Sequence, residues 1–167
     1  METATGGGPL AARVTAAAAE LLAAIARASR DNWPEAGGVA AQAESLRDRV
    51  APLADLTAQG YQEALGAVGG DFELGRAYAK AAEPPLLIAE AATAVAELAA
   101  HVAEYADPPL RADAVAAGFV AAGCVQAAAE LVAVNLTISA NDDRVRRADR
   151  LAEEAARTAE LARAARE

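Results

Sequence analysis

The sequence predicts an all-α fold, a bundle of five to six mostly antiparallel helices. Hydrophobic residues make up 54% of the chain, much of this share is alanine, and aromatic residues contribute only 4%. Alanine is the strongest helix former, and apolar residues such as Leu10, Val14, Leu21 and Ile25 recur near helical spacing. The 167 residues fit one domain, 1–167, around one core, with residues 1–5 as a loose N-terminus.

Proline, glycine and acidic residues mark where the predicted helices begin and end. Pro9 suits the first position of a helix, whereas Pro52 should kink or split the helix that contains it. Asp107 is a plausible N-cap, and the acidic residues of Asn141-Asp142-Asp143 suit the positive end of a helix dipole. The predicted helices span residues 9–30, 38–66, 71–81, 84–105, 110–139 and 142–166.

The charge and hydropathy of the chain exclude several classes of partner. The formal charge of −9 and the pI near 4.7 argue against nucleic acid, because its binding depends on Lys and Arg that neutralise phosphates. They also argue against a basic helix lying on a membrane surface. The least charged segment, 114–129, is shorter than the roughly 20 residues of a membrane span. We therefore expect a cytoplasmic protein with no membrane partner.

The chain contains one cysteine, Cys124, and one histidine, His101, so neither a disulfide nor a zinc site of the usual kind can form within one chain. We therefore expect no metal and no bound cofactor. His101 near a helix end suits the C-terminal dipole when charged. Cys124 fits a packing role in an alanine-rich contact. The opening METATGGG lacks the basic and apolar regions of a signal peptide.

Three groups of residues are candidates for a functional site. Gly6, Gly7 and Gly8 precede a helix, where free N–H groups and small side chains can bind an anion, although a flexible tail also explains them. Asp113 can act as an acid or base, or can simply be an acidic residue of a first helical turn. Asn135 lies among valine, leucine and isoleucine and needs hydrogen-bond partners if it is buried. It is a binding residue or an amide of the core or of an interface.

Asp113 and Asn135 are 22 positions apart on one predicted helix. An α-helix then separates them by roughly 40° in azimuth and roughly 33 Å along the axis, so they share a face but cannot form one site within a chain. Two copies of this helix packed antiparallel would bring Asp113 of one chain close to Asn135 of the other. The spacing is thus compatible with a symmetric homodimer whose sites lie at its interface.

Four stretches together resemble the cyclodeaminase/cyclohydrolase family, which includes the cyclodeaminase domain of formiminotransferase-cyclodeaminase and the bacterial methenyltetrahydrofolate cyclohydrolases. The resemblance depends on the order and spacing of the motifs and runs from about residue 5 to 160. The stretches are GGGPLAARVTAAAAELLAAIA at 6–26, EPPLLIAEAATAV at 83–95, RAD at 111–113 and VNLTISANDD at 134–143.

The resemblance implies a dimeric helical bundle that acts on one-carbon tetrahydrofolates. Cyclodeaminases close the ring of 5-formiminotetrahydrofolate and release ammonia, and cyclohydrolases open the ring of 5,10-methenyltetrahydrofolate with water. Both reactions need a positioned acid or base. By this resemblance Asp113 would be that group, Gly6–Gly8 would bind an anionic part of the folate, and Asn135 would orient the pterin.

Several polar residues that the family usually has are replaced in this chain. Pro9, Ala112 and Leu131 stand where the family usually has Ser, Ser and Asn, and AVGGDFELGRAYAK lacks the usual Tyr-Lys-Leu-Pro step. Thr57 stands where the family often has a catalytic acid, and a threonine cannot replace a carboxylate in proton transfer. Asp55 lies two residues earlier, so it faces away by about 200° unless Pro52 distorts the turn.

These replacements leave more than one function open. In an enzyme of this family, Asp113 or Asp55 would supply the acid, and Thr57 would line the substrate site. In a catalytically degenerate relative, the chain would bind folate without turnover or would serve as a helical dimer or assembly module. A generic helical interaction domain whose resemblance is coincidental is the third reading, since alanine-rich helices resemble one another easily.

Overall fold

A computed structural model describes residues 6–137 and 142–165 of the chain. These two ranges are almost entirely α-helical and contain no strand. The loose terminus expected at 1–5, the helix end expected at 138–139, the start signal at Asn141 and the helix end expected at 166 lie outside the described residues. The predicted all-α class is confirmed.

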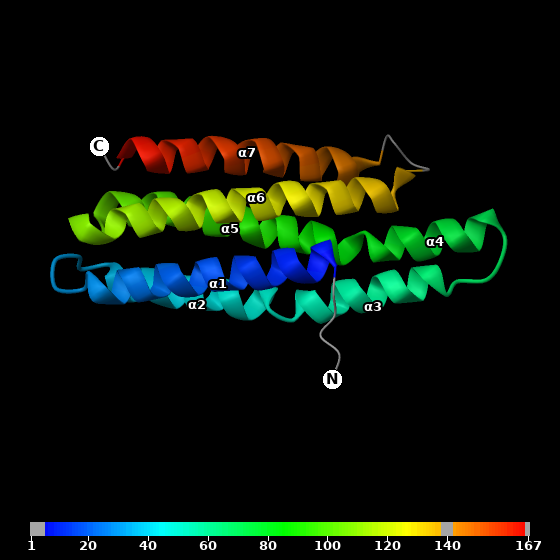
Figure 1. Ribbon diagram of the computed structural model, residues 1–167, viewed down its shortest axis with the longest axis horizontal. Coiled ribbons are helices and arrows are strands. Elements are labelled where there is room, and N and C mark those ends of the chain that lie inside the picture. Colours follow the sequence, from blue (N-terminus) through cyan, green and yellow to red (C-terminus); the bar gives the residue numbers. More distant parts are fainter. Residues whose placement is uncertain (1–5, 138–141, 166–167) are drawn as a thin grey trace.

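The helices form long rods that run up and down the molecule in chain order (Figure 1). Pro52 splits the second predicted helix in two, as expected, and the fourth and fifth helices continue each other across Ala82. Pro108–Leu110 form a short 3-10 turn before the sixth helix. The helices are α1 Gly7–Ala28, α2 Ala36–Val50, α3 Leu53–Leu65, α4 Asp71–Ala81, α5 Glu83–Tyr105, α6 Arg111–Asn135 and α7 Asp143–Ala165.

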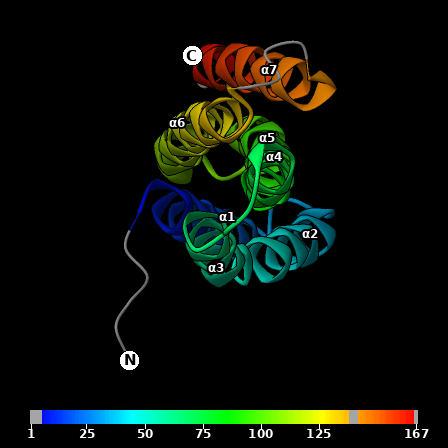
Figure 2. The ribbon, with the colours of Figure 1, turned by 90° about the vertical axis from the view of Figure 1, so that its right-hand side faces the viewer.

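Helix α5 lies in the middle of the bundle. It packs against α1 and α2 on one side and against α6 and α7 on the other, and α7 covers α5 and α6 from outside (Figures 1 and 2). Most side chains of this core are alanines, and the larger fully buried ones include Leu22, Ile88, Val95, Val102 and Val125. Small side chains let the helix axes approach closely, so the core consists of many short contacts, as the composition predicts.

Three helical segments are long and apolar enough to cross a membrane by length and composition alone: Gly7–Ala28, Asp71–Tyr105 and Pro108–Asn135. The expectation that the apolar segment around 114–129 is too short for this was therefore wrong, because the whole of α6 continues its low-charge character. More than half of each of these segments is buried against other helices of the bundle. Their hydropathy thus serves the core.

The end of the bundle where α1 and α5 finish is tied by polar and aromatic contacts. Asp107 does not cap a helix with its side chain, contrary to expectation, because its carboxylate accepts a hydrogen bond from Asn32 Nδ2 at 2.9 Å. Its backbone N–H donates to Ser29 Oγ at 3.0 Å. His101 packs against both Trp33 and Tyr105, with ring centroids 5.5 and 4.8 Å away, and these two rings stack on each other at 6.0 Å. These contacts are structural.

Candidate functional site

Part of the predicted site gathers where the start of α1 meets α3 and the end of α6. A Cβ on Gly7 would lie 3.6 Å from Leu131, and a Cβ on Gly8 would meet Thr57. Asn135 follows Leu131 by one helical turn, and its Nδ2 donates to the Leu131 carbonyl at 2.9 Å. The structure therefore places Gly6–Gly8, Thr57 and Asn135 at one end of the bundle.

The glycines at the start of α1 have different structural roles. Gly6 has φ +148°, a conformation that L side chains rarely adopt. A Cβ on Gly8 would lie 2.0 Å from Thr57 Cγ2, so no larger residue fits there without movement. At Gly7 the corresponding contact is an ordinary 3.6 Å. The backbone conformation explains why position 6 is a glycine, and close packing against Thr57 explains why position 8 is one. Neither reason depends on a ligand at the first turn of α1.

The Thr57 hydroxyl differs from the other buried helical hydroxyls. Thr15, Ser29 and Thr93 each donate to the carbonyl four residues earlier, at 2.8–3.0 Å. Thr57 is only 7% exposed, and its Oγ1 has no hydrogen-bond partner within the described residues. A buried hydroxyl without a partner is costly. Position 57, where the resemblance led us to expect an acid, is thus buried, and its methyl group packs on Gly8.

Asn135 and Arg144 together bind the C-terminal end of α4. Asn135 Nδ2 lies 3.4 Å from the Ala81 carbonyl, and Arg144 Nη1 donates to the Ala79 carbonyl at 2.8 Å. Carbonyls at a helix end have no partner inside the helix, so these two side chains satisfy them. The Asn135 carboxamide oxygen, in contrast, accepts no hydrogen bond from the described part of the chain. It remains free for a ligand.

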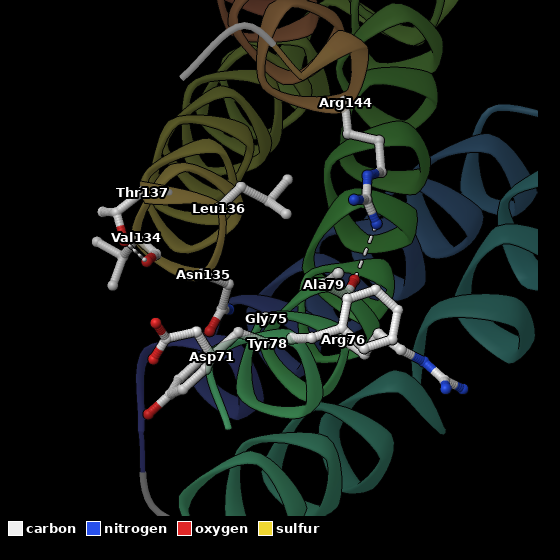
Figure 3. A pocket seen from close by; sticks show the side chains of 11 residues that line it. Asp71, Gly75, Arg76, Tyr78, Ala79, Val134, Asn135, Leu136, Thr137 and Arg144 are labelled. Carbon is white, nitrogen blue, oxygen red and sulfur yellow. Dashed lines mark hydrogen bonds between the residues drawn. The ribbon is translucent and has the colours of Figure 1, made fainter. Parts of the chain in front are cut away.

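A groove of about 530 Å³ lies between α4, the end of α6 and the start of α7, and we call it the Asn135 groove (Figure 3). Phe72 and Tyr78 supply aromatic surface, and Asp71, Arg76 and Arg144 supply charge. In Figure 3, Asn135 and Asp71 lie on one side of the groove and Arg144 lies on the other. The lining residues are Asp71, Phe72, Gly75, Arg76, Tyr78, Ala79, Val134, Asn135, Leu136, Thr137 and Arg144.

Arg144 is held in place by Asp142. Its Nε and Nη2 donate to the two oxygens of the Asp142 carboxylate at 3.0 and 2.8 Å, and its backbone N–H donates to the same carboxylate at 2.9 Å. The guanidinium and this N–H lower the pKa of Asp142 from 3.8 to about 2. Because Arg144 also binds α4, this ion pair ties the start of α7 to the wall of the groove.

Arg144→Gln is expected to lower the free energy of unfolding at pH 7 by about 1 kcal/mol, a modest value because both side chains keep solvent contact. The Asp142 pKa is depressed in the folded protein, so its contribution is complete above about pH 4 and is lost as the pH falls towards 2. Urea unfolding at pH 7, 4 and 2.5 measures this. The difference from the unmodified protein should shrink with pH, whereas Arg157→Gln, which breaks an exposed 3.9 Å pair, should change little at any pH.

The two predicted catalytic carboxylates do not reach the groove within one chain. Asp113 lies in the first turn of α6, at the opposite end from Asn135, and is exposed. Asp55 is exposed on α3 while Thr57 is buried, so the two face different sides, as the spacing predicted. The carboxylate that lines the groove is Asp71, which sequence reasoning missed. In the sequence Asp71 resembles any acidic residue of a first helical turn.

No group of three or more His, Cys, Asp or Glu side chains that could hold a metal ion occurs in residues 6–137 and 142–165. Cys124 is buried, and burial raises the pKa of its thiol. Its environment therefore makes it unreactive, in keeping with a packing role.

Comparison with known proteins assigns the family. The model of the family described as formiminotransferase-cyclodeaminase matches residues 1–157 of the chain. The chain belongs to this family. It is also similar in structure to formiminotetrahydrofolate cyclodeaminase from Thermotoga maritima, with a TM-score of 0.88, 19% sequence identity, and coverage of 96% of this chain and 86% of the other. No curated protein matches the chain.

Membership of the formiminotransferase-cyclodeaminase family confirms the resemblance that the sequence motifs indicated. A coincidental likeness among alanine-rich helices is excluded, because the match extends over nearly the whole chain. The family supports a cyclodeaminase-like function in folate one-carbon chemistry.

Proposed function

We propose that this protein binds a one-carbon tetrahydrofolate, 5-formimino- or 5,10-methenyl-tetrahydrofolate, in the Asn135 groove and acts on it as a cyclodeaminase or cyclohydrolase. The observation that carries the proposal is the free Asn135 oxygen in a groove with aromatic walls, in a chain of this family. No further cofactor is expected, and a folate enzyme of this kind is expected in the cytoplasm.

The groove suits the pteridine head of a folate. Its volume of about 530 Å³ lies in the range of small-molecule sites. Phe72 and Tyr78 offer ring faces on which a planar heterocycle can stack. A pteridine carries N–H donors at its edge, and the Asn135 carboxamide oxygen is a fixed acceptor because its Nδ2 is already bonded to backbone carbonyls.

The chemistry requires proton transfer. In ring closure the N10 amine attacks the formimino carbon, N10 loses its proton, and the C–N bond to the departing nitrogen breaks once that nitrogen is protonated and leaves as ammonia. In ring opening by a cyclohydrolase, water attacks the methenyl carbon and loses a proton, and the bond from that carbon to one ring nitrogen breaks as this nitrogen takes up a proton. A positioned carboxyl group can provide each proton transfer. Asp71 lines the groove in the same chain, and Asp113 can reach it only from a second copy.

The outer face of α6 fits a second copy of this chain. Phe119 and Val120 on this face are 39% and 45% exposed, and Leu10 and Leu21 of the neighbouring α1 are also exposed. Gly123 lies on the same face, and a Cβ there would meet nothing within 4 Å. Glycine within a helix costs roughly 1 kcal/mol relative to alanine. Nothing in the packing of one chain requires a glycine at position 123. A glycine there would let a second helix approach closely.

A two-fold axis beside Gly123 also completes the site. If two antiparallel α6 helices cross at Gly123, each residue before position 123 in one copy lies beside the residue equally far after it in the other. Asp113 of one copy then lies beside position 133 of the other, close to Asn135 at the end of α6. Each groove would then receive a carboxylate from the other chain. We therefore propose a homodimer with two shared sites, in which Asp113 is the acid or base and Asp71 the alternative within the same chain.

A second candidate function is folate binding without turnover, or assembly alone. The packing of Thr57 favours it, because a buried threonine at the position where an acid was expected supplies no carboxylate for proton transfer. The same dimer could then serve as a helical assembly module. A measurement of turnover distinguishes this candidate from the proposed enzyme.

The direct test follows the absorbance of 5,10-methenyltetrahydrofolate in both directions, its formation from 5-formiminotetrahydrofolate and its loss to water, against a control without protein. Rates above the control are expected. Asp113→Asn should lower kcat by at least about 100-fold if it transfers the proton, and Asp71→Asn is the matched change in the same groove. Unchanged turnover in both variants would contradict both assignments. No turnover in the unmodified folded protein would favour the second candidate.

A further inference from the structure

A second groove of about 530 Å³ adjoins the Asn135 groove on the other side of α4. We call it the Lys80 groove and define it by its charged lining residues Glu73, Arg76, Lys80, Glu83 and Arg144. The two grooves share Arg76, Ala79 and Arg144. The aromatic lining residues, Phe72 and Tyr78, belong to the Asn135 groove, and the Lys80 groove has none.

Most charges of the Lys80 groove already have partners. Lys80 pairs with Glu63 at 3.0 Å, and Arg144 pairs with Asp142. The Glu73 carboxylate accepts a hydrogen bond from the Gly70 N–H at 3.1 Å. Glu83 interacts electrostatically with the guanidinium of Arg144. Among the charged lining residues, Arg76 is therefore the one without a partner in the described residues.

Arg76 lies at the boundary of the two grooves. It is exposed and forms no hydrogen bond or ion pair within the described residues. In Figure 3 its guanidinium extends from α4 away from Asn135. Arg76 lines both grooves. A guanidinium is suited to bind a carboxylate through two parallel hydrogen bonds, whereas an ammonium acts as a point charge.

We infer that Arg76 binds the carboxylate end of the folate ligand and thereby fixes which way the molecule lies along the joined grooves. This inference rests on the proposed function. A tetrahydrofolate carries its pteridine at one end and a glutamate with two carboxylates at the other. With the pteridine against Phe72 and Asn135, the glutamate would extend past Ala79 into the Lys80 groove. Arg76 is thus a specificity-determining residue that selects folates bearing glutamate over pteroates.

The test is a double-mutant cycle between protein and ligand. Calorimetry of the full-length protein gives dissociation constants for 5-formyltetrahydrofolate and for 5-formyltetrahydropteroate, the same molecule without its glutamate. Arg76→Ala should weaken binding of the first by about three- to tenfold and weaken binding of the second clearly less, because the second ligand loses only contacts with the arginine stem. Arg76→Lys should restore part of the loss. Thermal unfolding of the variants should match the unmodified protein, because Arg76 is exposed and has no partner.

Arg150→Ala is the matched control, since Arg150 is another exposed arginine without a partner in the described residues, placed on α7. It should alter neither dissociation constant. Equal weakening of both ligands by Arg76→Ala, or no effect on either, would overturn the role of Arg76 and leave the proposed function standing. If the unmodified protein bound neither ligand, the proposed function would fail and the role of Arg76 would fail with it.

Discussion

Replacing Gly8 with alanine is expected to destabilise the protein by about 2 kcal/mol, which lowers the melting temperature by about 4–8 °C in a chain of this size. The new methyl group would lie 2.0 Å from Thr57 Cγ2 and 3.1 Å from Thr57 Cβ. Thr57 is buried and part of a rigid helix, so it cannot rotate away without losing its own packing. The strain outweighs the gain that alanine normally brings to a helix.

Thermal and urea unfolding of four proteins test this packing. Gly7→Ala is the control, because its methyl group would make an ordinary 3.6 Å contact with Leu131, and it should change stability little. Adding Thr57→Ala to Gly8→Ala should recover about 1 kcal/mol or more, since it removes Cγ2. If Gly8→Ala were as stable as Gly7→Ala, the close contact between α1 and α3 would be refuted.

Gly123→Trp is expected to weaken self-association by about 100-fold, because an indole at the crossing point of two helices prevents their close approach. The Cβ of residue 123 faces open space in the single chain, so the fold itself should tolerate the change. Since each groove is proposed to need Asp113 from the other copy, the monomer should also lose turnover.

Sedimentation velocity measures the oligomeric state, and Gly37→Trp is its control. Gly37 is an exposed helical glycine whose Cβ would also meet nothing within 4 Å, but it lies on α2, away from the α6 face.

Mixing inactive Asp113→Asn and Asn135→Ala proteins provides a second test. Random exchange of subunits should restore about a quarter of the activity if the sites are shared, since half of the dimers would carry one intact site. A dimeric Gly123→Trp protein would be incompatible with this interface.

The helices could be predicted almost completely from the sequence. Residues 71–81 were predicted as a helix with the bounds of α4, and Pro52 separates α2 from α3 as expected. These features depend on local chemistry, namely helix propensity and the missing N–H of proline. The Asp107 side chain was less predictable, because its partner Asn32 lies 75 positions earlier in the chain.

The candidate site was predictable only in part. Of the residues identified from the sequence, Asn135 lines the groove, whereas Gly6–Gly8 and Thr57 lie at the contact of α1 with α3 and do not line it. Asp71, Phe72, Tyr78 and Arg144 were missed, because α4 and α7 look like ordinary amphipathic helices until their packing is known. No sequence pattern within α4 or α7 indicates which of its residues will face the end of α6.

The sequence by itself determined the helical fold class, the approximate extent of most helices and the separation of Asp113 from Asn135, because these follow from composition, turn residues and the fixed rise of an α-helix. The order and spacing of its motifs indicated the family. Only the tertiary structure decided that Thr57 is buried against Gly8, that Asn135 holds the end of α4, and that the walls of the groove come from α4, α6 and α7. Contacts of this kind depend on which helix faces meet, and in an alanine-rich bundle many faces look alike in sequence.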